Sequence, residues 1–392
     1  MKDRVTYTSQ VLYVGPTGEG GSLGESTISG VVPAQLDHIN YIEHSIEAEN
    51  VHVYNYGSKE PIGEVIVDPP QVQMEFQYNL ADAQNEKWLG FNISNLDKSF
   101  ISGILNEEND EQNFYILTTL RGDAVTKASQ LEFEQEDNNT VTSFGNCVIE
   151  NYSLAASLSA PPTASIKVIG DNITYSNGVT GIKCPNDFKC EFAETVSLPA
   201  PREDDLEVDA LRPAYLNLYF EEPNSPQGGY VLPSQNTKDK TLSSCSLESF
   251  EINLELPRRI AKGLGNKHPV SKKIQYPAEV NFTCNASVKD IVSGSLLDVF
   301  CAEGNNLLIE MNNPYNNEDN IKVKLKDLHL DSQVSEHSLS NQEYVELNFS
   351  SPLGSPESSQ VGIFMSGVAD KAQETYYGTT PSQLLAGEKS TR

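Results

Sequence analysis

An internal repeat constrains the fold of this 392-residue chain more than any other feature of its sequence. Residues 57–82 align without a gap on residues 265–290, a shift of 265 − 57 = 208 positions, and seven of the 26 aligned pairs are identical. Unrelated segments of ordinary composition would share about two. Such a repeat predicts two copies of one folding unit along the chain. The identical pairs are Gly57/Gly265, Lys59/Lys267, Pro61/Pro269, Ile66/Ile274, Pro69/Pro277, Val72/Val280 and Asp82/Asp290.

The alignment continues outside this block. Gly20-Gly21 falls on Gly228-Gly229 at the same shift, and residues 12–14 meet residues 218–220 at the nearby shift of 206. The alternative interpretation is two unrelated β domains that share one proline-bounded strand. Because proline fixes φ and removes a hydrogen-bond donor, two prolines at matching places favour the duplication.

Alternating apolar and polar residues predict strands in both copies. In the second copy the alternation runs through residues 320–326, its phase slips at Asp327, and Leu328 and Leu330 resume it. The other clear strand patterns are residues 72–78, 249–256 and 344–349.

Each copy also has one segment with apolar residues at helical spacing, residues 80–91 in the first and 288–300 in the second. A helix packed on an antiparallel sheet would cover its open apolar face. We expect Trp88, the only tryptophan, to anchor that contact in the core rather than to bind a ligand. The predicted fold class is therefore mainly β, with two tandem β-sandwich or half-barrel domains that each carry one packed α-helix.

Composition suggests where these domains end. Residues 1–170 form the first predicted β domain and residues 213–350 the second. Between them, residues 171–212 include a polar, acidic, proline-marked stretch that predicts a connector. Residues 351–392 begin with a Ser/Pro/Gly-rich link and predict a flexible C-terminal tail without a core of its own.

The chain is strongly acidic, with 27 basic and 55 acidic side chains and a net charge of 27 − 55 = −28. This charge argues against a surface that grips nucleic acid or anionic lipid, although an acidic wall would let DNA slide past without sticking. The first residues lack the apolar core of a signal peptide, and no run is long and apolar enough for a membrane anchor. We expect synthesis and assembly in a cytoplasm.

The cysteines and the short motifs predict no active site, cofactor or metal. A reducing cytoplasm disfavours disulfides; Cys184 and Cys190 could close a small loop or bind a metal, but no second ligand pair accompanies them. Residues 20–24 match GxSxG formally, but no helix pattern follows Ser22, so a loop is the better interpretation. The tripeptide Arg121-Gly122-Asp123 is most simply a turn, and the six histidines form no metal-ligand pattern.

Two matched loops of the repeat differ in charge. The simple interpretation is that both are solvated; the sharper hypothesis is that they meet across a subunit or ring-stacking interface, where complementary charge sets the register. The basic residues are Arg258, Arg259, Lys262, Lys267, Lys272 and Lys273, and the acidic residues of the other copy are Glu47, Glu49, Glu60 and Glu64.

The order of these elements resembles that of bacteriophage tail tube (major tail) proteins of the kind with a duplicated domain. The resemblance lies in the strand 249–256, the loop 257–277, the strand 280–284 and the helix 288–300, with their counterparts in residues 39–91. It implies a structural virion protein, with three chains forming a pseudo-hexameric ring whose sheets close into an inner β-barrel. The connector and the tail depart from the family pattern.

The resemblance also implies partners and a location. The partners would be copies of the chain in homotrimeric rings stacked into a tube, other tail proteins, and DNA that passes through the lumen without specific binding. The location would be the virion tail, assembled in the host cytoplasm. Two alternatives remain: a two-domain β-sandwich adhesin or receptor-binding virion protein, and a hydrolase that uses Ser22.

Overall fold

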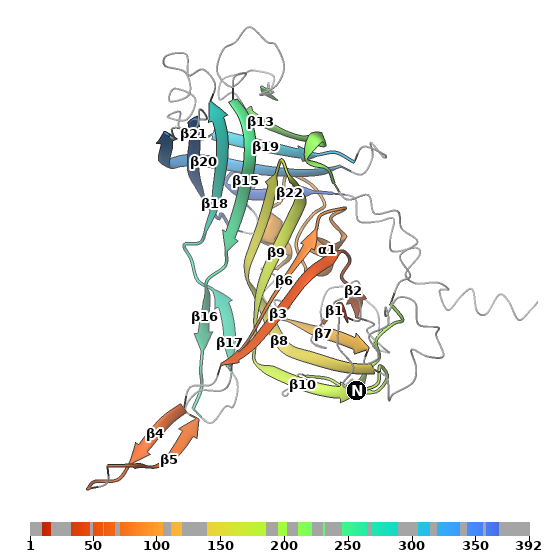
Figure 1. Cartoon of the computed structure of the whole chain (residues 1–392), viewed down its shortest axis with the longest axis vertical. Coiled ribbons are helices and arrows are strands. Elements are labelled where there is room, and N and C mark those ends of the chain that lie inside the picture. The colour runs from red at the N-terminus through yellow and green to blue at the C-terminus, as the bar shows by residue number, and fades with distance from the viewer. Residues whose placement is uncertain are drawn as a thin grey trace, which may run out of the picture.

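The computed structural model is mainly β, and its strands form a single 16-stranded sheet system with three small separate hairpins (Figure 1). The described residues are 10–16, 33–47, 50–57, 59–66, 71–104, 111–119, 139–185, 195–201, 211–221, 230–231, 245–264, 269–288, 305–313, 320–337, 343–355 and 358–367. Among them, no helix is long and apolar enough to cross a bilayer.

Eight antiparallel strands form one continuous layer, called the long sheet below. Strands from the first and second halves of the chain meet in its middle, where β8 pairs with β15, so the sheet does not stop between the halves. Its order is β3 (Ile39–Glu47), β6 (Gln71–Asn79), β9 (Ala160–Gly170), β8 (Asn139–Ser157), β15 (Cys245–Glu255), β18 (Glu279–Val288), β21 (Glu343–Pro352) and β20 (Ile321–His337).

A second set of strands extends from the first parts of β8 and β20, which are long enough to serve both sets. Together the two sets give each half a sandwich-like form around its apolar side chains. On β8 the additional strands are β7 (Gln112–Thr119), β10 (Asn172–Asn177), β1 (Gln10–Pro16) and β2 (Ala34–Gln35). On β20 they are β19 (Asn305–Met311), β22 (Gly362–Ser366), β13 (Leu216–Glu221) and β14 (Tyr230–Val231).

The remaining elements are short. They comprise the hairpins β4 (Asn50–Tyr54)/β5 (Pro61–Ile66), β16 (Arg258–Ala261)/β17 (Ser271–Ile274) and β11 (Ile182–Lys183)/β12 (Thr195–Val196), the helix α1 (Gln84–Trp88), and the 3-10 turns η2 (Phe100–Gly103) and η5 (Pro213–Tyr215). In Figure 1 the β4–β5 hairpin extends away from the body of the molecule.

The strand order of the first half recurs in the second. The path β1-β7-β8-β9-β6-β3 corresponds to β13-β19-β20-β21-β18-β15, and β10 and β22 occupy equivalent positions on β8 and β20. The register agrees as well: Ile42 pairs with Phe76, and Phe250 pairs with Cys284, both 208 positions further along.

The irregularities of the strands also recur at equivalent places. The β3–β6 pairing shifts register between Ile39 and Tyr41, and the β15–β18 pairing shifts between Leu247 and Ser249. The β8–β9 pairing shifts between residues 149 and 151, and the β20–β21 pairing between residues 330 and 332, a separation of 181. β-bulges are specific structural features that fix register and bend a strand, so chance does not readily repeat them.

The core consists of the inward-facing residues of both halves in one connected apolar cluster. Phe76 of β6 is fully buried and contacts Phe114 of β7, with ring centroids 5.8 Å apart. In the second half, the ring centroids of Phe282 of β18 and Phe349 of β21 lie 5.9 Å apart. Trp88 is only 8% exposed and belongs to this cluster, which confirms its expected place in the core.

The strand predictions are confirmed, and the helices and loops differ in detail. The four expected strands correspond to β6, β15, β20 and β21, and the phase slip at Asp327 is a change of register in β20. The helix expected over residues 80–91 covers only Gln84–Trp88. In the second copy, Val288 ends β18 and residues 289–300 lie outside the described residues. The two charged loops contain antiparallel hairpins, β4–β5 and β16–β17.

Parts of the expected connector and tail pack on the body. Residues 172–177 form β10, and Val179, Ile182 and Leu198 join a small apolar cluster with Tyr13 and Tyr115. Residues 362–366 form β22, where Phe364 is fully buried, whereas a tail without a core was expected. The apolar run from Ile363 to Met365 was too short to give a strand period by itself. Residues 368–392 lie outside the described residues.

Candidate interaction surfaces

The outer face of the long sheet is mainly polar and is called the polar face; its exposed side chains also include Tyr41 and Val334. Its side chains alternate with the buried residues: Glu251, Asn253 and Glu255 of β15 point out, while Phe250, Ile252 and Leu254 are buried. The members of the polar face include Glu43, Glu47, Glu75, Lys167, Asn151, Ser153, Glu251, Asn253, Glu255, Asn281, Thr283, Asp331, Glu346, Asn348 and Ser350.

Hydrogen bonds between neighbouring strands order the side chains of the polar face. Asn151 donates to Asn253 at 2.6 Å across the β8–β15 junction. Thr283 donates to Asn348 at 2.7 Å, and Asn348 donates in turn to Ser332 at 3.1 Å. These hydrogen bonds link short amide and hydroxyl side chains of neighbouring strands to one another.

The charge of the polar face is mainly negative. Seven of the members named above are carboxylates and one, Lys167, is basic; its Nζ lies 2.7 Å from Glu150. The shallow hollows on this face run across β8, β15, β18 and β21 and are lined by small and polar residues, including Ser157, Asn253 and Thr283. Such a surface repels phosphate and offers no enclosed pocket for a small ligand.

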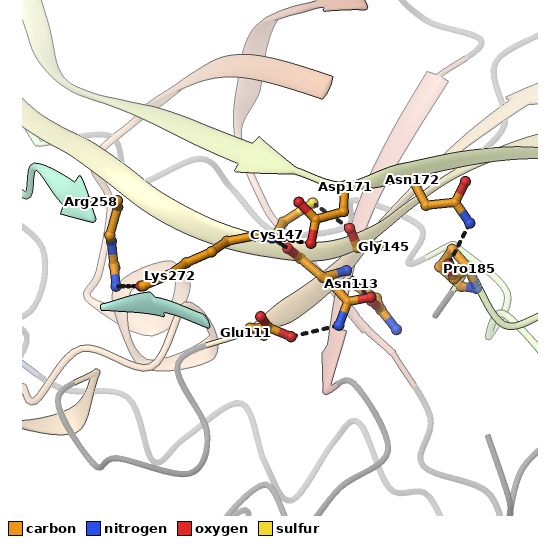
Figure 2. Close-up of polar contacts among 10 residues, drawn as sticks. Glu111, Asn113, Gly145, Cys147, Asp171, Asn172, Pro185, Arg258 and Lys272 are labelled. Carbon is orange, nitrogen blue, oxygen red and sulfur yellow. Dashed lines mark hydrogen bonds and ion pairs between the residues drawn. The ribbon is translucent and has the colours of Figure 1, made fainter. Parts of the chain in front are cut away.

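The second candidate surface lies where the β16–β17 hairpin of the second half meets the first half. We call it the docking cluster and define it as Arg258, Lys272, Asn146, Ile149 and Asp171. Figure 2 shows Arg258, Lys272 and Asp171 of this cluster. The hairpin follows directly from β15, whose end is held to the first half by a hydrogen bond from Leu256 N–H to the Glu150 carbonyl at 2.8 Å. Pairing between β15 and β8 therefore positions the hairpin against the first half.

Lys272 is the buried charge of the docking cluster, with 5% of its surface exposed. Its Nζ lies 2.6 Å from the carboxylate of Asp171 and donates to the carbonyl of Asn146 at 2.5 Å. Asp171 is held by its backbone N–H, which donates to the Gly145 carbonyl at 3.1 Å. A buried ammonium is tolerated only with such partners, so the pair fixes how the hairpin sits on the first half.

Arg258 makes the second attachment. Its Nε and Nη2 donate to the carbonyl of Ile149 at 3.0 and 2.8 Å, and its Nη1 donates to the carbonyl of Lys272 at 3.3 Å. Ile149 lies beside a register shift of β8. The guanidinium thus binds the strand at its bulge and supports the neighbouring lysine.

Asn146 lies under the hairpin in a left-handed conformation, with φ of 53°. Its N–H donates to Asn113 Oδ1 at 3.1 Å and its side-chain amide donates to Glu111 at 2.5 Å; Figure 2 shows Asn113 and Glu111. Nearby, burial raises the pKa of Cys147 to about 12, so this thiol stays protonated and is a poor nucleophile or metal ligand. The described residues contain no group of three or more potential metal ligands.

A buried carboxylic acid is the third unusual group. Glu86 of α1 is fully buried, and its Oε1 accepts hydrogen bonds from Tyr78 at 2.8 Å and from Tyr152 at 3.3 Å. Among the residues that the structure describes, its Oε2 has no hydrogen-bond partner. Burial raises the pKa of Glu86 to about 7 and that of Tyr78 well above its ordinary value. Because solvent does not reach Glu86, we assign it to the core rather than to catalysis.

The residues expected at the loop interface are only partly brought together. Arg258 and Lys272 join the docking cluster, while Arg259, Lys262 and Lys273 remain exposed. In the other copy, Glu64 pairs with His52 at 3.1 Å within β4–β5, Glu47 ends β3, and Glu60 is exposed beside β5. Glu49 and Lys267 lie outside the described residues, as do Ser22 and the segment 121–123.

Sequence reasoning missed Asp171, Asn146, Glu86 and most of the polar face. The alternation of polar residues in β15 and β18 could have indicated the face, but Asp171 is 101 positions from Lys272 and no local pattern joins them. In comparisons with known proteins, no family model and no curated protein matches this chain.

Proposed function

We propose that this chain is a structural subunit of a virion tail, and that three copies assemble into pseudo-hexameric rings that stack into a tube. The observation that carries the proposal is the β8–β15 junction. There β15 of the second half pairs with β8 of the first half in seven register positions, from Ser249–Ser157 to Glu255–Asn151. This contact is head-to-tail, and head-to-tail contacts generate rings or filaments when repeated.

The matched registers support a tandem duplication behind this arrangement. Both halves have the same strand order and share two register shifts at equivalent positions. Two β domains related only by chance would share neither. If the halves are copies, each presents equivalent edges, and three chains supply six equivalent units. Since each chain contributes eight strands to the long sheet, a ring of three would contain 3 × 8 = 24.

The polar face supports a role as the wall of a channel for DNA. When a curved sheet closes into a barrel, alternate residues point to the lumen. A lumen lined by Glu251, Glu255 and Glu75, with few basic groups, would repel the phosphate backbone and keep DNA from adhering. The net charge of −28 adds to this repulsion.

Electron microscopy of the purified protein over a range of concentrations and salt tests the proposal. The expected result is rings or tubes with three chains per ring, and the same rings in the tails of the virions that contain the chain. Monomers under every condition, together with virions whose tails lack this chain, would contradict it.

A two-domain adhesin or receptor-binding virion protein is the second candidate, favoured by one observation. Tyr54, at the end of β4, is 60% exposed, and Tyr56, in the turn that follows it, is fully exposed. Aromatic side chains at an exposed tip are typical of binding surfaces. Saturable binding to host cells that is lost in Tyr54→Ser/Tyr56→Ser, without any ring formation by the parent chain, would favour this candidate.

A further inference from the structure

The two ends of the long sheet are strands whose outer edges have no partner among the described residues. At one end β3 pairs only with β6. At the other end, residues 329–337 of β20 pair only with β21. Open edges expose backbone donors and acceptors and readily add another strand. The side chains nearby are correspondingly exposed, with Ile46 at 47% and Val334 at 48%.

The chain itself shows what covers an edge of this kind. β15 occupies in the second half the place that β3 occupies in the first, and its outer edge pairs with β8. The effect on burial is direct: Leu254 is fully buried, whereas Ile46, its equivalent 208 positions earlier, is half exposed. Ile252 is likewise fully buried, while His44 is exposed. β3 has the apolar residues for such a contact and lacks only the neighbouring strand.

The same comparison applies to the other edge. Residues 149 and 151 of β8 flank a register shift against β9, and residues 330 and 332 of β20 flank the equivalent shift against β21. The segment of β8 that pairs with β15 is residues 151–157, and its residues 151–156 therefore correspond to residues 332–337 of β20. This is the segment whose outer edge is open.

We propose that residues 42–47 of β3 in one copy pair antiparallel with residues 332–337 of β20 in a second copy, in the register of the β15–β8 junction. Glu251 pairs with Ala155 within the chain, so Glu43 pairs with Glu336 between chains; Asn253 pairs with Ser153, so Ser45 pairs with Val334. In each intermolecular pair the two numbers add to 379. The inference rests on the proposed ring assembly and specifies its contact.

The occupant of this edge is a second copy because one chain carries both halves of the contact at opposite ends of its long sheet. A six-residue ladder at each end leaves no edge of the long sheet open once the ring closes. The buried ion pair of the docking cluster does not recur at this contact, since Glu64 stands at the position equivalent to Lys272. Strand pairing, rather than a repeated salt bridge, therefore defines it.

Cysteine cross-linking of the full-length assembled protein tests the register. Facing residues of an antiparallel pair lie about 4.5–5.5 Å apart at Cα, within the range of a disulfide. Ser45→Cys/Val334→Cys should give species of two and three chain masses on oxidation. The matched intrachain pair, Asn253→Cys/Ser153→Cys, should oxidise without a change of mass. Single variants control for the native cysteines.

Glu43→Cys/Ser332→Cys is the register control. These positions are four residues out of register, about 13 Å along the strand, so they should give at least tenfold less intermolecular product. Rings that form without the Ser45–Val334 link, or that link Glu43 to Ser332 instead, would overturn this inference and leave the proposed function standing. A chain that remains monomeric at every concentration would overturn both.

Discussion

At the scale of single residues, two sites with buried ionisable groups distinguish this protein from an ordinary β-rich chain. Lys272 and Asp171 join the second half to the first, and Glu86 lies under the long sheet with two tyrosines around it. In both sites burial removes a polar group from water, but the protein replaces the lost water contacts more fully in one site than in the other. The lysine is compensated by a carboxylate, whereas the glutamic acid has one oxygen without a partner among the described residues.

Replacing Lys272 with methionine should lower the free energy of unfolding by about 3–5 kcal/mol, because Asp171 then stays buried without its counter-charge. Lys273, the next residue, is exposed, and Lys273→Met should change stability by less than about 0.5 kcal/mol. Denaturant unfolding measures both. Adding Asp171→Asn to Lys272→Met should recover part of the loss; equal effects of the two lysine variants would contradict the assigned role.

The acid at Glu86 should make stability depend on pH in a specific direction. Its pKa rises from 4.5 to about 7 on folding, so the folded state holds the proton up to higher pH. Its contribution is present below pH 4.5 and is lost as the pH rises through about 7. Glu86→Gln removes this pH dependence. As the pH rises from 4.5 to above 7, the free energy of unfolding of this variant should increase by about 3 kcal/mol relative to that of the parent chain, at 1.36 kcal/mol per pKa unit. The test is unfolding at several pH values; a constant difference would contradict it.

At the scale of elements, bulges shape this fold as much as regular strands do. β8 and β20 each contain a residue in the left-handed region, Asn146 with φ of 53° and Asp327 with φ of 61°. In both cases its N–H donates to a nearby asparagine, Asn113 at 3.1 Å and Asn306 at 3.2 Å. The bulge at this residue bends each long strand, so that β8 and β20 pass from the second set of strands into the long sheet.

Truncating the asparagine that supports each bulge should give a measurable loss in the free energy of unfolding. Asn113 is fully buried, and Asn113→Ala should cost about 1–3 kcal/mol because the N–H of Asn146 loses its acceptor. Asn306→Ala should cost less, since Asn306 is only half-buried and water can replace its side chain. Thermal or denaturant unfolding of the two variants compares them. A larger loss at Asn306 would contradict this account.

At the scale of elements the sequence predicts strands well and their ends poorly. Alternation reports burial on one face, and it located β6, β15, β20 and β21. It also located the change of phase at Asp327, because a bulge exchanges the two faces of a strand. The β22 strand was missed because its residues 363–365 are buried on both sides and do not alternate.

At the scale of the whole molecule, the long sheet makes the two halves parts of one structure. The β8–β15 ladder runs without interruption, and the apolar cluster includes residues of both halves. Separate units joined by a flexible connector would show neither feature. The repeat in the sequence is thus compatible with a single cooperative body.

Such a body should unfold in one transition. Fluorescence of Trp88, the only tryptophan, reports on the first half, and far-ultraviolet circular dichroism reports on the strands of both halves. The two signals should have the same midpoint in denaturant, because unfolding either half exposes the β8–β15 edge of the other. Midpoints that differ beyond the experimental error would show that the halves unfold independently.

The sequence by itself determined four of the strands, the place of Trp88 in the core, and a repeat in which residues 57–82 match residues 208 positions further along. These follow from local periodicity and from self-similarity, which need no knowledge of contacts. Only the tertiary structure decided that β15 pairs with β8, that Lys272 reaches Asp171, and that β3 and β20 are left at the ends of the sheet. Each of these depends on residues about 100 or more positions apart, and pairing over such distances is selected by the packing of the whole chain.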